Sequence, residues 1–233
     1  MKRIVIEGPG KNALGTDLMV RLREEVAAGA GEGLLFVGSG DAFSAGLDLK
    51  EVASLDLDGM DRFLRRLQDL LLELYLYPGP TVACVNGHAI AGGCLVALVC
   101  DHRVGARNPR ARIGLNEVAL GLRFPPVLLQ IAAARVTRVE EVVLGSKLHD
   151  PESALRLGLL DELADDAAAL ERAEQVLKYL ESLPREAYAA AKRDLRARHA
   201  AMDHEANRAF LEEVLPVWTS DELKARILKM LQR

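Results

Sequence analysis

Residues 80–95 constrain the fold of this chain more than any other stretch. They hold the apolar, β-branched run 81–85, then Asn86-Gly87 and the adjacent glycines Gly92 and Gly93, and an apolar segment, residues 95–100, follows. A strand, a glycine turn and a helix in this order aim backbone N–H groups at a ligand, because the first N–H groups of a helix have no partner within it. We therefore predict the centre of the functional site at this turn, with Glu117 downstream as its chemical group.

Composition excludes several classes of function. Half of the 233 residues are hydrophobic and 27% are charged, as in an ordinary globular protein, but only 4% are aromatic, so Leu, Val, Ile and Ala must build the core. The net charge of −4 and the lack of a long basic run argue against nucleic acid or a membrane as partner. Because residues 1–6 are charged too early for a signal peptide, we expect a cytoplasmic protein.

The three cysteines, Cys84, Cys94 and Cys100, are odd in number and lie among apolar neighbours. This pattern is typical of buried thiols in a reducing compartment. Cys94, beside the glycines, is the one candidate nucleophile, but no base is dedicated to it. No His, Cys or carboxylate cluster has metal-ligand spacing, so we predict no metal.

Strand and helix signals alternate in the first two thirds of the chain. Strands are predicted at residues 3–7, 34–37, 81–85 and 101–106, and a long amphipathic helix over 58–77. The alternation indicates βαβ units with a largely parallel sheet. Past Pro125-Pro126 the signals are mostly helical, so we divide the chain into an α/β core, residues 1–160, and a helical region, residues 161–233. Apolar stripes on the last helices predict a homo-oligomer.

Residues 38–49 follow a buried-type strand and contain three glycines. A loop of this kind lets backbone approach a ligand closely. It fits an ordinary connection between a strand and a helix equally well. The glycines match neither a P-loop nor a dinucleotide fingerprint, so use of a nucleoside triphosphate or NAD is not expected.

Three motifs in order, residues 43–49, residues 85–94 and Cys100-Asp101, resemble the crotonase superfamily, also called the enoyl-CoA hydratase/isomerase family. The resemblance covers essentially the whole chain, from residues 12–14 to the helical tail, with residues 151–154 and 158–161 as its later landmarks. It implies an α/β fold with a crotonase-like ββα-type spiral core and a C-terminal helical oligomerisation region. Residues 108–110, 113–117 and 120–121 look most like the 3,2-trans-enoyl-CoA isomerases of fatty acid β-oxidation, and this likeness implies a homotrimer or a dimer of trimers.

The resemblance also implies the site residues. Its substrate would be an acyl-CoA, with coenzyme A as part of the substrate and no separate cofactor. The catalytic groups would be the backbone N–H groups of Ala45 and Gly92, which hold the thioester oxygen, and the carboxylate of Glu117. The implied substrate-binding residues are Ser44, Ala45, Gly46, Leu47, Asp48, Gly92 and Asn116.

Leu95 separates isomerase from hydratase. Hydratases of the family are known for two glutamates, and this chain has Leu95 at the first position and Glu117 at the second. One carboxylate can take a proton from C2 and return one to C4, whereas addition of water is easier with two. An apolar wall also tends to raise the pKa of Glu117 and exclude water. The alternatives are a weak hydratase, a hydrolase, a decarboxylase or an inactive crotonase-like subunit.

Other polar residues fit structural roles better than catalytic ones. Asp48 fits a helix N-cap, Asp101 a structural partner near the sheet, and His88 and His102 structural histidines. Residues 118–129 are candidates for the wall of an acyl-tail pocket. The resemblance places the adenine end of coenzyme A near residues 44–48, and the candidates for its phosphates, from another subunit, are Lys224, Arg226 and Lys229.

Overall fold

Two parallel sheets form the centre of the molecule. The structure is a computed structural model that describes residues 1–201 and 204–231. The larger sheet has the order β1 (Lys2–Ile6), β2 (Leu34–Gly38), β4 (Thr81–Val85), β6 (His102–Ala106) and β8 (Glu162–Ala164), with every pair parallel. The smaller sheet has the order β3 (Ala42–Ser44), β5 (His88–Ile90) and β7 (Ile113–Gly114). The predicted strands and the parallel sheet are confirmed.

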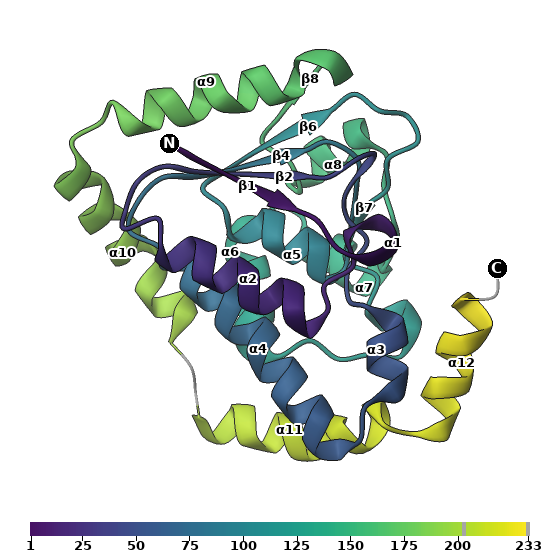
Figure 1. The fold of residues 1–233 in the computed structure, drawn as a ribbon. Helices are drawn as coiled ribbons and strands as arrows, with labels where there is room; N and C mark the ends of the chain where they lie inside the picture. Colours follow the sequence, from purple (N-terminus) through teal and green to yellow (C-terminus); the bar gives the residue numbers. More distant parts are fainter. Residues whose placement is uncertain (202–203, 232–233) are drawn as a thin grey trace.

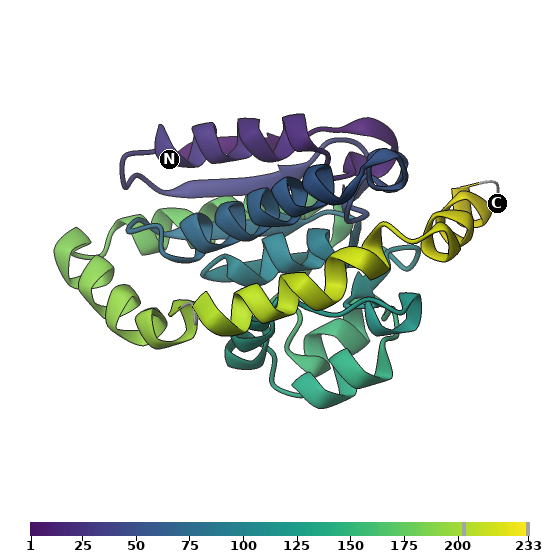
Figure 2. The ribbon, with the colours of Figure 1, turned by 90° about the horizontal axis from the view of Figure 1, so that it is seen from below.

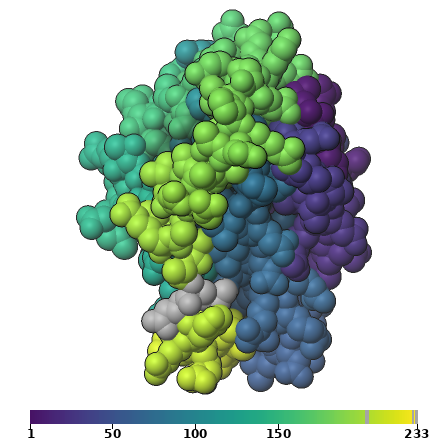
Figure 3. All heavy atoms as spheres, turned by 90° about the vertical axis from the view of Figure 1, so that its left-hand side faces the viewer, coloured from purple at the N-terminus to yellow at the C-terminus, as the bar shows by residue number. Residues whose placement is uncertain are grey.

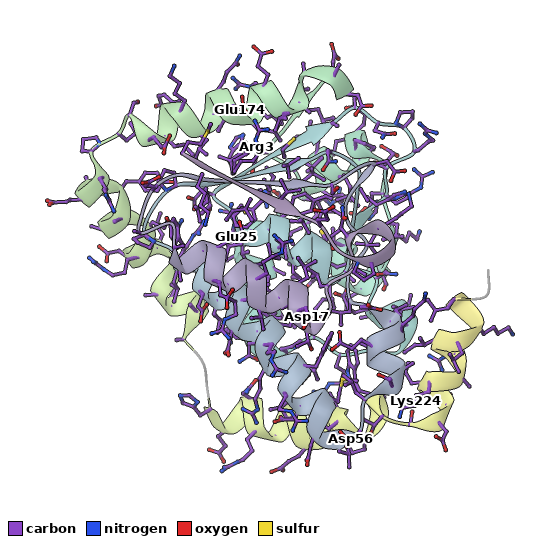
Figure 4. All side chains as sticks on the ribbon, viewed as in Figure 1. Arg3, Asp17, Glu25, Asp56, Glu174 and Lys224 are labelled. Carbon is purple, nitrogen blue, oxygen red and sulfur yellow. The ribbon has the colours of Figure 1, made fainter. Side chains whose placement is uncertain are left out.

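Helices cover both faces of the larger sheet (Figure 1). On one face lies α9 (Ala169–Glu181), which buries Leu35, Val82 and Val104 and whose Glu174 pairs with Arg3 of β1 (Figure 4). On the other face lie α2 (Thr16–Ala27), α4 (Leu57–Tyr75) and α5 (Gly92–Val99). Every residue of α5 is buried, so this helix runs through the main core. The described residues hold no helix long and apolar enough to cross a membrane.

The remaining helices surround this core. They are α1 (Pro9–Asn12), α3 (Leu49–Ser54), η1 (Val118–Leu120), α6 (Pro126–Arg135), α7 (Val139–Gly145), α8 (Pro151–Leu157), η2 (Asp166–Ala168), α10 (Arg185–Ala200), α11 (His204–Trp218) and α12 (Asp221–Leu231). Figure 2, seen from below, shows α11 running across the underside of the molecule between α10 and α12. Because α11 packs on α4 and α6, the C-terminal helices contribute to the core of their own chain.

The predicted division at residue 160 is wrong. Strand β8 pairs with β6 through Val104 and Glu162, and α9 covers that pair, so the division would cut the core. A three-residue, half-buried strand is too short to give a periodic signal, and β8 was therefore not predicted from the sequence. The part of the chain that follows the sheet begins after α9.

Asp101 is confirmed as a structural partner. Its carboxylate accepts hydrogen bonds from the backbone N–H of Thr81 (2.7 Å) and from Lys192 Nζ (2.9 Å), and it pairs with Arg196 (2.7 Å). These bonds tie α10 to the start of β4 and to the end of α5.

The predicted character of the cysteines is confirmed as well. All three are buried, and burial raises the pKa of Cys84, Cys94 and Cys100 to about 12 each. A thiol with so high a pKa is a weak nucleophile at neutral pH. No group of three His, Cys, Asp or Glu residues in the described part of the chain is arranged to hold a metal ion.

Candidate active site

The loop after β3 presents one free backbone donor, and it is not the predicted one. The N–H of Ala45 donates to the carbonyl of Lys11 (2.9 Å), so it is engaged within the protein and the prediction for Ala45 as an oxyanion donor is wrong. Ser44 is fully buried, and its hydroxyl donates to the carbonyl of Asn12 (2.8 Å). Both residues hold the loop in place from inside.

The free donor is the N–H of Leu47. Leu14 donates its N–H to the carbonyl of Gly46 (2.7 Å) and accepts from the N–H of Asp48 (3.1 Å), forming a parallel bridge with Leu47. In such a bridge the N–H of the central residue points to the other side. No acceptor for this N–H is present among the described residues, and Leu47 lines a cavity. Gly46 permits the turn, because its φ of +94° is a conformation that favours glycine.

A second backbone N–H without an acceptor in the described chain lies at the start of α5. The N–H of Gly92 is the first of this helix and has no acceptor among the described residues. A side chain at Gly93 would lie 2.3 Å from the carbonyl oxygen of Ser44, so only glycine lets α5 approach β3. The Leu47 side chain lies 3.2 Å from the place where a Cβ on Gly92 would be. The two free N–H groups therefore belong to adjacent residues of one cavity.

Glu117 is the acidic group of this cavity. It follows β7 and begins the turn η1, and its Oε2 is buried without a hydrogen-bond partner in the described part of the protein. Burial raises the pKa of Glu117 to about 7. The neighbouring Asn116 lines the same cavity, and its Oδ1 is likewise buried and unpartnered there.

The cavity is small and apolar, with a volume of about 170 Å³. Among its described lining residues Glu117 is the only carboxylate, and Leu95, 3% exposed, forms part of the apolar wall. The lining consists of Ala45, Leu47, Leu49, Leu64, Leu67, Ile90, Ala91, Gly92, Leu95, Asn116, Glu117, Leu120, Leu122, Arg123, Phe124, Pro125, Leu128, Phe210 and Trp218. Such a shape suits an apolar chain with a few polar groups at one end.

Part of the cavity lining was predicted from the sequence. Six residues of the predicted tail segment 118–129 line the cavity, whereas Val118 is exposed. The sequence analysis missed Phe210 and Trp218 of α11, whose spacing of eight residues puts them on one helix face. Leu64 and Leu67 of α4, which the sequence analysis did not place at the site, line the cavity as well.

The other predicted residues lie around the site. The carboxylate of Asp48 accepts from the N–H groups of Lys50 (2.9 Å) and Glu51 (3.3 Å), which confirms it as the N-cap of α3. His88 accepts a hydrogen bond from the N–H of Arg112 (3.2 Å), and His102 lies 3.3 Å from Glu162. Neither histidine lines the cavity.

The candidates for coenzyme A phosphates are on α12, which packs against α3 of its own chain. Lys224 donates to the carbonyl of Leu55 (3.0 Å), close to Asp56 at the start of α4 (Figure 4), and Arg226 donates to the carbonyl of Leu120 (3.0 Å). Lys229 is exposed. The role of these three in binding coenzyme A stays a prediction.

Comparison with known proteins decides the family. The model of the family described as enoyl-CoA hydratase/isomerase matches residues 3–225. The chain belongs to this family. The chain is 34% identical over 144 residues to the mitochondrial enoyl-CoA delta isomerase 1 of Mus musculus, and 36% identical over 147 residues to a putative enoyl-CoA hydratase of Thermus thermophilus. These matches cover 61% and 60% of this chain and 50% and 56% of the relatives, so the chain matches about half the length of each.

Solved structures extend the likeness to the whole chain. The human mitochondrial delta3-delta2-enoyl-CoA isomerase superposes with a TM-score of 0.91 at 26% identity, over 99% of this chain and 93% of that one. The α/β crotonase fold with parallel sheets and C-terminal helices, which the resemblance implied, is thereby confirmed.

Proposed function

We propose that the protein is an isomerase that converts 3-enoyl-CoA to 2-trans-enoyl-CoA. The observation that carries this proposal is the presence of one carboxylate, Glu117, in a cavity whose other described lining residues are apolar or lack a carboxyl group. The names of the mouse and human relatives agree with it. The Thermus relative is named a hydratase, so the choice between the two reactions depends on the site.

In the proposed reaction the thioester oxygen accepts hydrogen bonds from the N–H groups of Leu47 and Gly92. Loss of a proton from C2 pushes the electron pair into a dienolate, whose negative charge develops on that oxygen. Two donors fixed by the protein stabilise this charge without rearranging, and removing one such donor typically slows a reaction by ~10²–10³-fold.

Glu117 would move the proton. As a carboxylate it takes the proton from C2, and as the resulting carboxylic acid it returns a proton to C4, so that the double bond ends between C2 and C3. A pKa of about 7 suits both halves of the step, because the group is available as base and as acid near neutral pH. Hydration would need a second group to serve the water, and Leu95 supplies none.

The test compares two substrates and two matched variants. Purified protein is given 3-enoyl-CoA and 2-enoyl-CoA separately, and the double-bond position is followed by absorbance and mass spectrometry. Glu117→Gln is expected to lower isomerisation by ~10²–10⁴-fold, the usual contribution of a general acid–base group. The control, Glu32→Gln, alters a carboxylate outside the cavity whose side chain is 65% exposed, and it should leave turnover unchanged. Equal turnover by wild type and Glu117→Gln would reject the proposal.

We also propose that the protein assembles as a homotrimer or a dimer of trimers and acts in the cytoplasm. The basis for the assembly is the resemblance together with exposed apolar side chains on the outer helices, such as Val217 of α11 and Leu228 of α12. The basis for the compartment is the three free, buried cysteines, which suit a reducing environment. Light scattering at micromolar concentration tests the assembly, and a monodisperse monomer would contradict it.

A further inference from the structure

A second cavity, of about 380 Å³, lies at the other end of α5. Its wall is formed mainly by α10 and α6, on the side of the molecule that faces the viewer in Figure 3. It is lined by Tyr75, Asp101, Ala134, Arg135, Tyr188, Ala191, Lys192, Leu195, Arg196, Arg198 and His199. The catalytic cavity shares none of these residues, so the two cavities are separate sites.

Backbone carbonyls at the helix ends hold the cations of this cavity in place. Arg135 donates through Nε to the carbonyl of Leu98 (3.1 Å) and through Nη2 to those of Cys100 (2.8 Å) and Asp101 (3.0 Å). Arg196 donates through Nη1 to the carbonyls of Tyr75 (2.7 Å) and Val99 (3.2 Å), and its guanidinium lies 4.4 Å from the centre of the Tyr75 ring. The guanidinium groups are thus positioned before any ligand arrives.

The charges in this cavity do not balance. Three cations, Arg135, Lys192 and Arg196, meet one carboxylate, Asp101, which is the only acidic residue in the described lining. Lys192 and Arg196 share that carboxylate, and they are only 7% and 6% exposed. Among the described residues, Arg135 pairs with carbonyls alone, since the nearby carboxylate of Asp161 is bound by another arginine, Arg103. Two positive charges therefore remain without a counter-charge.

Burial of unpaired charge is costly, and it shows in the ionisation of the cluster. Burial lowers the pKa of Lys192 to about 8, an effect that Asp101 opposes and Arg196 reinforces. Burial also lowers the pKa of Arg135, and the positive charges of Arg103 and Arg196 add to that effect. The rim adds more positive charge, because Arg198 lines the cavity beside His199, to which its Nε donates (2.9 Å).

We propose that this cavity binds a doubly charged oxyanion of the phosphate class. Such a ligand supplies the two missing negative charges, and its oxygens match the planar fork of an arginine. In the described chain, the Nη1 group of Arg135 donates no hydrogen bond, and the guanidinium of Arg198 donates only to His199. Both groups are therefore available to the ligand. Its source is inorganic phosphate or the phosphate ester of a larger molecule.

The experiment measures the thermal stability and the affinity of the full chain with inorganic phosphate at constant ionic strength. Wild type is expected to show a saturable rise in Tm, about 5–10 °C at a hundredfold excess over Kd. Sodium chloride of the same ionic strength is the control for screening, and O-phosphoserine is the ester probe. If O-phosphoserine binds more tightly than inorganic phosphate, the site is assigned to a phosphate ester. If the two bind equally, it is assigned to free phosphate, and both results support the proposal.

Two variants locate the binding. Arg135→Gln keeps an amide donor for the carbonyls but removes the charge, and is expected to weaken phosphate binding by more than tenfold. Arg198→Gln alters an exposed side chain at the rim, so it should not affect folding, and it should weaken phosphate binding about three- to tenfold. The matched control is Arg193→Gln on the same helix, 69% exposed and outside the cavity, with no effect expected.

Three results would overturn the proposal. One is a phosphate response no larger than that of sodium chloride. Another is binding that is unchanged in both Arg135→Gln and Arg198→Gln. The third is loss of assembly in Arg198→Gln without any phosphate response in wild type, which would assign the cavity to acidic side chains of a second copy.

Discussion

Replacing Glu117 by Gln should lower the activity and, at neutral or alkaline pH only, raise the unfolding free energy of the protein. The carboxyl group has a pKa of about 7 in the folded protein against 4.5 when it is freely solvated. A folded pKa above the unfolded one means that the folded state holds the proton more tightly. The contribution of Glu117 to the unfolding free energy is therefore full below pH 4.5 and is lost as the pH rises through 7. At about 1.4 kcal/mol for each pH unit, the whole loss is about 3 kcal/mol.

Glutamine resembles the neutral acid, so the variant avoids this loss. Urea unfolding of wild type and Glu117→Gln, at one protein concentration and at several pH values from 4.5 to 8, measures the difference directly. We expect the variant to gain about 3 kcal/mol relative to wild type between pH 4.5 and 8. A difference in unfolding free energy that does not change with pH would show that burial of the carboxylate is not what raises its pKa.

Four further predictions test other parts of the site. Leu95→Glu should raise hydration of 2-enoyl-CoA at least about tenfold by supplying a second acid–base group, whereas Leu95→Gln should not. An amide-to-ester replacement that removes the N–H of Leu47 should lower kcat by ~10²–10³-fold, while the same replacement at Ala45 should lower stability and spare kcat. Trp218→Ala should raise kcat/KM for a twelve-carbon acyl chain relative to a six-carbon one by about three- to tenfold, with a loss of stability of about 3–5 kcal/mol. Ala91→Gly should raise the unfolding free energy by about 1 kcal/mol, because Ala91 has a φ of +49°, which costs an L-residue more than glycine. Enzyme assays with matched chain lengths and urea unfolding check these values, and an effect of the opposite sign would contradict each.

The sequence predicted what depends on neighbouring residues. Gly92 at the start of a buried helix, the wall residue Leu95 and Glu117 after a short strand are all local features. Four of the five strands of the larger sheet could be predicted for the same reason, since β4, for example, is an apolar run buried at every residue. Asp48 as an N-cap likewise needs only the residues that follow it.

The features of the site that could not be predicted from the sequence depend on contacts between distant residues. Whether Ala45 or Leu47 offers its N–H is decided by Lys11 and Leu14, which accept and donate from another segment. Phe210 reaches the cavity only because α11 folds back across α4. The helical pattern of α11 identifies its apolar face and not the surface that this face covers.

The most direct test of the central claim is the ratio of two kcat/KM values for the wild-type protein, one for isomerisation of 3-enoyl-CoA and one for hydration of 2-enoyl-CoA of the same chain length. With a single carboxylate in an apolar cavity, isomerisation should exceed hydration by ~10²-fold or more. Hydration as fast as isomerisation would contradict the assignment of Glu117 as a proton shuttle that works without a second acid–base group.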